Sequence, residues 1–199
     1  MLFAAWTGDT KALQMRNAVD MNHKVRKFAG PHLAAINGHV EAIKVLKELG
    51  ADMAAKNNEG SSPVHSAALN GQVEVIKVMQ ELGADMAAKN NGGSSPVHFA
   101  ASNGHVEVIK VLQELGADMA AKDNEGSSPV HWAAENGQVE AIKVLQEVGV
   151  DILAKDTWGR TARQLAEQFG HSNASKILKE MEVVGKTMTG RAGWYRRKQ

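Results

Sequence analysis

The chain contains no cysteine among its 199 residues. This absence excludes disulfide bonds, thiolate metal sites and cysteine nucleophiles, and it fits an intracellular protein of a reducing compartment, the cytoplasm or the nucleus. Aromatic residues make up only 5% of the chain. No apolar stretch approaches the ~18 residues that a membrane span needs. The first residues also lack the basic start of a signal peptide. We therefore expect neither a signal peptide nor a transmembrane segment.

Proline is also scarce, and three of the four prolines mark an internal repeat. Pro63, Pro96 and Pro129 stand 33 residues apart, each in the string Ser-Pro-Val-His. Residues 57–89 and 90–122 align without a gap and are identical at 28 of 33 positions. A fixed period of this length is typical of a stack of small units, none of which buries its apolar face alone. We therefore expect function on an extended surface and not in an enclosed pocket.

Each unit has the pattern of a turn followed by two helices. Residues 57–89 begin with asparagines and a glycine that favour a turn. Ser62 followed by Pro63 is typical of a helix start, and Gly71 is expected to end that first helix. A second helix is expected over about 73–83, because its apolar residues recur at steps of three and four. The sequence thus predicts an all-α stack of helix-turn-helix units.

Several spaced features agree in three consecutive units. In the first of these units they are Ser62-Pro63-Val64-His65, Ala67-Ala68, Asn70-Gly71, Val73-Glu74 and Gly83-Ala84-Asp85. This pattern resembles the ankyrin repeat. The resemblance extends over about residues 2–182 and implies an ankyrin-repeat solenoid whose helix pairs are joined by β-hairpin-like turns. It also implies a non-enzymatic module for protein–protein interaction, a scaffold or an adaptor.

The period divides the chain into successive units. We predict a partial N-terminal capping repeat at 1–23, ankyrin repeats at 24–56, 57–89, 90–122 and 123–155, a C-terminal capping repeat at 156–185, and a basic tail at 186–199. The C-terminal unit lacks the proline and histidine of the motif. It carries Glu167 and Ser172 where inner units have alanine and valine. Such polar residues suit a terminal unit, because its outer face meets water.

A histidine recurs at one position of four units, as His32, His65, His98 and His131. A stack would align these imidazoles, and histidine is a common general base and metal ligand. Units about 10 Å apart hold neighbouring rings too far apart to share a zinc ion, whose ligands lie about 2 Å away. The resemblance instead implies hydrogen bonds within and between turns. We expect no catalytic residue, no metal and no cofactor.

Positions that vary between nearly identical units indicate where packing does not determine the side chain. The resemblance implies that partners meet the turn tips and the exposed end of the first helix. The expected partner-binding residues are Asn58, Glu59, Leu69, Asn91, Asn103, Asn124, Glu125, Glu135, Asn136, Trp158 and Arg160. Trp158 and Arg160 belong to residue types that dominate interface hot spots, although Trp158 alternatively covers the last layer. Phe99 and Trp132 are expected to pack between helices.

Charge is unevenly distributed along the chain. Residues 57–155 hold 13 acidic residues and 6 lysines, whereas 1–56 and 156–199 carry net charges of +3 and +5. An acidic centre favours a basic partner segment, or simply reflects solvated helix faces. The tail is basic and aromatic, and it is either a recognition segment or a disordered terminus. Its expected binding residues are Arg191, Trp194, Tyr195, Arg196 and Arg197.

These patterns together predict a monomeric, non-enzymatic module that binds a protein partner across a concave strip of turn tips and first-helix ends. A basic segment is the expected form of that partner. The alternative is an architectural spacer or adaptor, recruited through the tail to a nucleic acid, a membrane surface or an acidic protein. A regulatory part of an enzyme is a further alternative, for which the sequence offers no motif.

Overall fold

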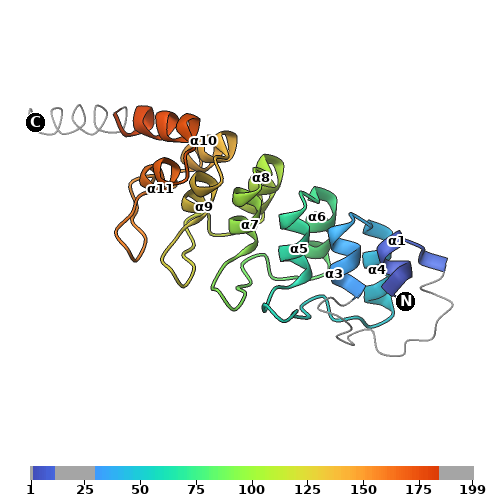
Figure 1. Cartoon of the computed structure of the whole chain (residues 1–199). Coiled ribbons are helices and arrows are strands. Elements are labelled where there is room, and N and C mark those ends of the chain that lie inside the picture. The colour runs from blue at the N-terminus through green and yellow to red at the C-terminus, as the bar shows by residue number, and fades with distance from the viewer. Residues whose placement is uncertain (1, 12–29, 184–199) are drawn as a thin grey trace, which may run out of the picture.

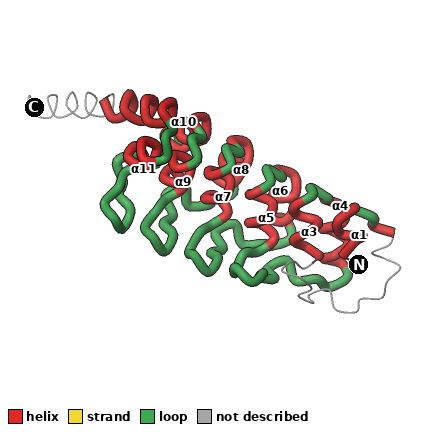
Figure 2. The backbone as a smooth tube through the Cα atoms, in the orientation of Figure 1, coloured by secondary structure: helices red, strands yellow, loops and turns green. Residues whose placement is uncertain are grey.

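The structure is a computed structural model, and it describes residues 2–11 and 30–183. In these residues helix pairs follow one another in a row, and the turns between pairs project from one side of that row (Figures 1 and 2). No strand occurs in the described part of the chain. The prediction of an all-α solenoid of helix-turn-helix units is therefore confirmed.

The helices alternate between a first and a second helix of each unit. The first helices are α3 (Gly30–Ile36), α5 (Pro63–Leu69), α7 (Pro96–Ser102), α9 (Pro129–Glu135) and α11 (Ala162–Gln168). The second helices are α4 (Val40–Glu48), α6 (Val73–Glu81), α8 (Val106–Glu114) and α10 (Val139–Glu147). Helix α1 (Leu2–Thr7) packs against α3, and a further helical segment over 172–183 follows α11.

The helix boundaries follow the signals in the sequence. Helix α5 begins at Pro63 after Ser62, which has extended backbone geometry and lies in a capping box with His65. Gly71, with φ of 73°, lies just beyond its end. Helix α6 ends before Gly83, whose φ is 82°. A positive φ is readily adopted only by glycine, so these glycines stop both helices where the sequence predicts.

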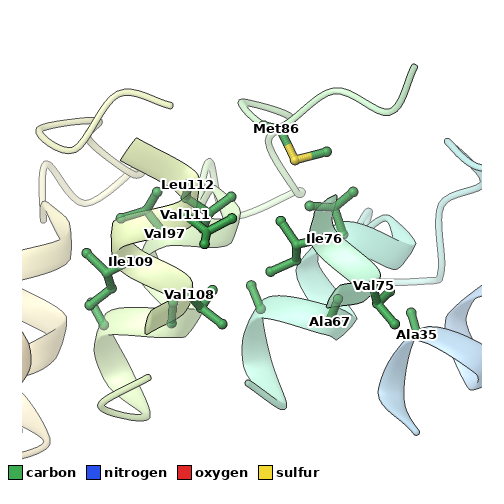
Figure 3. Close-up of a cluster of buried hydrophobic side chains, with 14 of the residues drawn as sticks. Ala35, Ala67, Val75, Ile76, Met86, Val97, Val108, Ile109, Val111 and Leu112 are labelled. Carbon is green, nitrogen blue, oxygen red and sulfur yellow. The ribbon is translucent and has the colours of Figure 1, made fainter. Parts of the chain in front are cut away.

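Small residues and branched apolar residues together form the core between neighbouring units. Ala67 and Ala68 of α5 are fully buried, as are Ile76 and Met79 of α6. Figure 3 shows Ala67 and Ile76 in one unit and Val97, Val108 and Leu112 in the following unit. Alanine lets the first helices approach closely, and each buried isoleucine or leucine contributes about 1.5–3 kcal/mol. The core therefore runs along the row and is shared by adjacent units.

Side chains that follow the inter-helix glycines tie each unit to the preceding one. Gln72 donates from Nε2 to the carbonyl of Ile36 at 2.9 Å, and His105 makes the equivalent contact with Leu69 O at 3.0 Å. These carbonyls lie at the end of a first helix, where no intrahelical donor remains. Glutamine and histidine therefore alternate here as hydrogen-bond donors to the end of the preceding first helix.

The final unit is held together by charged side chains. Arg163 of α11 donates from Nε to Glu182 Oε1 at 3.0 Å and also pairs with Glu167. Ser175 Oγ donates to the same Glu167 carboxylate at 3.1 Å. These contacts fasten the 172–183 helix to α11. The expected unit boundaries stay predictions, and the tail at 186–199 lies outside the described residues.

Candidate functional site

Each turn between units is built around one side-chain oxygen. Asn57 Oδ1 accepts hydrogen bonds from the backbone N–H groups of Glu59 and Ser61, both at 2.9 Å. Asp123 and Asp156 do the same in their own turns. An oxygen that accepts from residues two and four positions later fixes the turn locally. The tip between those residues is therefore held in place while its own side chains stay exposed.

Hydrogen bonds also join neighbouring turn tips. The side chains of Asn91 and Asn124 donate to Asn58 O and Asn91 O, at 3.2 and 3.0 Å. The backbone bonds are Asn91 N–H to Glu59 O at 2.9 Å, Asn124 N–H to Gly92 O at 2.9 Å and Thr157 N–H to Glu125 O at 3.0 Å. Two of the expected partner-binding asparagines thus also order the surface on which they lie.

A lysine row adds a second connection between turns. Lys56 Nζ donates to the backbone carbonyl of Lys89 at 3.0 Å, and Lys89 contacts that of Lys122 at 2.6 Å. Lys122 in turn reaches Lys155 O at 2.9 Å. Sequence reasoning missed this row. The available signal was the recurrence of lysine every 33 residues, immediately before each turn.

The buried histidines connect the turns from beneath. His65 Nδ1 lies 3.1 Å from the backbone N–H of Ser62, and its Nε2 lies 3.1 Å from Ser94 O. The N–H group only donates and the carbonyl only accepts, so the ring is the neutral tautomer with its proton on Nε2. Burial lowers the pKa of His65 to about 4. The structural role expected for this row is confirmed, since His98 and His131 have equivalent contacts.

The exposed ends of the first helices hold the other expected binding residues. Leu69 of α5 is 42% exposed, and Glu135 of α9 is partly exposed at the equivalent position. Asn103 and Asn136 donate from their side chains to the carbonyls four residues earlier, at 3.0 and 2.9 Å. These asparagines therefore finish their helices, and the side chains at the Leu69 position remain free to meet a partner.

Two aromatic side chains pack between first helices, as expected. The rings of Phe99 on α7 and Trp132 on α9 are 5.5 Å apart at an interplanar angle of 68°, and both are half-buried. Phe99 also meets His65 edge-on at 5.7 Å. Trp132 donates from Nε1 to Asp123 Oδ2 at 2.9 Å. The sequence did not predict this last bond, which joins a side chain of a first helix to the turn of the same unit.

The last turn presents the most exposed tryptophan of the described residues. Trp158 is 58% exposed, and the guanidinium carbon of Arg160 lies 4.6 Å from the centre of its ring. Arg160 Nε in turn donates to the buried carboxylate of Asp156 at 2.7 Å. Burial alone raises the pKa of Asp156, but hydrogen bonds from Arg160 outweigh it, so the pKa is lowered. The two residues singled out in the sequence are therefore in contact and pre-ordered.

The expected residues fall into two groups, one at the turn tips and one at the ends of the first helices. The turn tips hold Asn58, Glu59, Asn91, Asn124, Glu125 and Trp158, with Arg160 stacked on Trp158, and the first-helix ends hold Leu69, Asn103, Glu135 and Asn136. The tail residues Arg191, Trp194, Tyr195, Arg196 and Arg197 lie outside the described residues. No helix described in this structure has the length and apolarity to span a membrane.

Two depressions are lined by described residues. A depression of about 350 Å³ lies where α6 and α8 end, and another of about 200 Å³ lies between two linkers and the start of α5. Among the described residues, no group of three histidine, cysteine or carboxylate side chains could hold a metal ion. The turn tips, by contrast, are both exposed and joined by hydrogen bonds.

Comparisons with known proteins identify the repeat. The family described as "Ankyrin repeats (3 copies)" matches residues 82–156, and "Ankyrin repeats (many copies)" matches 32–80. Together the two matches cover more than half of the chain. A comparison with curated proteins gave no significant match. Ankyrin repeats generally mediate protein–protein interaction and are typically non-enzymatic. The 33-residue period, the paired helices, the ordered turns and these two matches agree, and the chain belongs to the ankyrin repeat family.

Proposed function

We propose that this protein is a non-enzymatic module that binds a basic segment of a partner protein along its turn tips and first-helix ends. The observation that supports this most is the row of turn tips, joined by backbone hydrogen bonds at Asn91, Asn124 and Thr157. A surface that is already ordered loses little conformational entropy when a partner binds. Many small contacts can then add along the row.

Charge supports a basic partner. Residues 57–155 carry a net charge of −7. Glu59 and Glu125 are exposed at the turn tips, and Glu135 is partly exposed at the far end of α9. The lysines of the same turns donate to backbone carbonyls. Acidic surfaces attract basic segments and speed their association, an effect that salt weakens. Trp158, with its ring held against Arg160, supplies an aromatic anchor at one end.

The charge reversal Glu125→Lys with Glu135→Lys tests this proposal. A basic peptide selected from a random library on the immobilised full chain serves as the probe. We expect the double variant to bind it at least tenfold more weakly, equal to about 1.4 kcal/mol. Fluorescence anisotropy with the labelled peptide measures this. The preceding unit has Gly92 and Ser102 at the positions equivalent to Glu125 and Glu135, so we expect the fold to tolerate both substitutions.

A matched control reverses Glu114 and Glu147, which are exposed at the ends of α8 and α10. It changes net charge by the same amount but on the second helices, in the unit that holds Glu125 and Glu135 and in the unit before it, and we expect binding within twofold of the unmodified chain. Deletion of residues 186–199 tests the alternative that the tail recruits the partner. Binding along the turn tips should survive this deletion. Equal weakening by both double variants, or loss of binding with the tail, would contradict the proposal.

A further inference from the structure

One unit has small residues where its neighbours have large ones. At the turn tip, Gly92 stands where the adjacent units have Glu59 and Glu125. Its φ is not positive, and a Cβ placed there would come no closer than 3.4 Å to another atom, Asn90 Oδ1. The backbone therefore does not require glycine at this position. Because Gly92 has no side chain, the turn tip in the middle of the row lacks the glutamate that the tips on either side carry.

The same unit is also small at the exposed end of its first helix. Ser102 of α7 stands where the adjacent units have Leu69 and Glu135. Leu69 is 42% exposed, so a larger side chain at this position projects into solvent and does not meet the core. Packing therefore does not require serine either. Because α5, α7 and α9 pack in sequence, Ser102 lies between a leucine on one side and a glutamate on the other.

Half-buried aromatic rings lie one helical turn before these positions. Phe99 precedes Ser102 by three residues on α7, and Trp132 precedes Glu135 by three on α9, so each pair shares a helix face. The two rings contact each other at 5.5 Å, and the bond from Trp132 to Asp123 fixes the indole. We define the inner-face patch as Leu69, Phe99, Ser102, Trp132 and Glu135.

The inner-face patch combines the apolar side chain of Leu69, the aromatic rings of Phe99 and Trp132, and the carboxylate of Glu135. Arginine has an aliphatic stem that packs on apolar surface, and its planar cation stacks on aromatic rings and pairs with carboxylates. The chain already makes one such stack, between Arg160 and Trp158 at 4.6 Å. We propose that the inner-face patch binds one arginine side chain of the partner, with the stem against Leu69 and Phe99 and the guanidinium at Trp132 and Glu135. This proposal rests on the proposed function and deepens it.

The substitution Ser102→Leu tests the proposal by filling the middle of the patch. The sequence offers the precedent, because Leu69 occupies the same position one unit earlier, and net charge does not change. The probe is the selected basic peptide, made with each arginine in turn replaced by citrulline, which is neutral and of similar shape. We expect Ser102→Leu to weaken binding at least tenfold. One of the citrulline peptides should bind the unmodified chain at least tenfold more weakly than the parent peptide does. The same replacement should weaken binding to the Ser102→Leu variant less than twofold.

Gln113→Leu is the control, since it adds an exposed leucine to the same unit on α8, and we expect its binding to stay within twofold. Thermal unfolding checks that both variants fold. Weakening by the Glu125 and Glu135 reversals with no effect of Ser102→Leu would overturn the inner-face patch and leave the proposed function standing. Weakening by Ser102→Leu with no sensitive arginine would overturn the assignment of arginine. If neither the charge reversals, nor Ser102→Leu, nor any citrulline replacement weakened binding, both proposals would be overturned.

Discussion

At the scale of single residues, the buried histidines His65 and His98 are held by hydrogen bonds at both ring nitrogens. His65 accepts the N–H of Ser62 at Nδ1 and donates to Ser94 O from Nε2, so a second ring proton would face a donor. Burial lowers the pKa of His65 first, and the nearby charge of Lys56 lowers it further. The same direction holds for His98, where burial outweighs the opposing charge of Asp123. Joining the turns therefore requires the neutral ring.

This constraint predicts acid sensitivity. The unfolded chain binds a proton at an ordinary histidine pKa near 6.5, whereas folded His65 binds one only near pH 4. The stabilisation is therefore complete above pH 6.5 and is lost as the pH falls toward 4. For His65 alone, the free energy of unfolding should drop by about 3 kcal/mol over that range. Urea unfolding followed by circular dichroism at pH 7.5 and 4.5 measures the drop.

His65→Gln is the matched variant, because Gln164 fills the equivalent place in the last unit and accepts the N–H of Thr161 at 2.9 Å. The variant should lose less stability than the unmodified chain between pH 7.5 and 4.5. An identical pH dependence of the two proteins would show that His65 does not titrate as its surroundings imply.

At the scale of helices and turns, the sequence predicted most of the boundaries and few of the lateral contacts. Ser62, Pro63 and Gly71 are local signals, so the limits of α5 follow from neighbouring residues alone. The lysine row and the bond from Trp132 to Asp123 depend on how one unit lies against another or how a turn folds back onto its helix. Such contacts become evident only when the stacking is known.

The inter-helix glycines give a prediction at this scale. Gly71 and Gly83 have φ of 73° and 82°, so alanine costs about 1–2 kcal/mol of backbone strain at either. A Cβ at Gly71 would also lie 2.9 Å from Nδ1 of His105, whereas at Gly83 it meets nothing within 4 Å. Gly71→Ala should therefore destabilise the protein more than Gly83→Ala in urea unfolding.

His105→Ala isolates the contact with the ring. In that background, Gly71→Ala and Gly83→Ala should cost similar free energies of unfolding, because only the backbone strain remains. A persistent difference between the two alanine variants after removal of His105 would show that the glycine serves another purpose.

At the scale of the whole molecule, the described helices form a row of layers in which each first helix packs against the first helices of adjacent layers. The expected binding residues recur at the same positions of successive layers, and sequence spacing alone placed Glu125 at a turn tip and Glu135 at the end of a first helix. Their role in binding stays a prediction. The pairing of Arg160 with Trp158 could not be foreseen, since it depends on the buried carboxylate of Asp156.

The most direct test of this account is the removal of one complete layer, residues 90–122, so that Lys89 is followed by Asp123. The new junction repeats the natural one between Lys122 and Asp123. A row of layers predicts a folded, helical protein that unfolds in urea with an m-value about a sixth smaller, in proportion to the lost surface. A shortened chain that fails to fold, or one with an unchanged m-value, would contradict it.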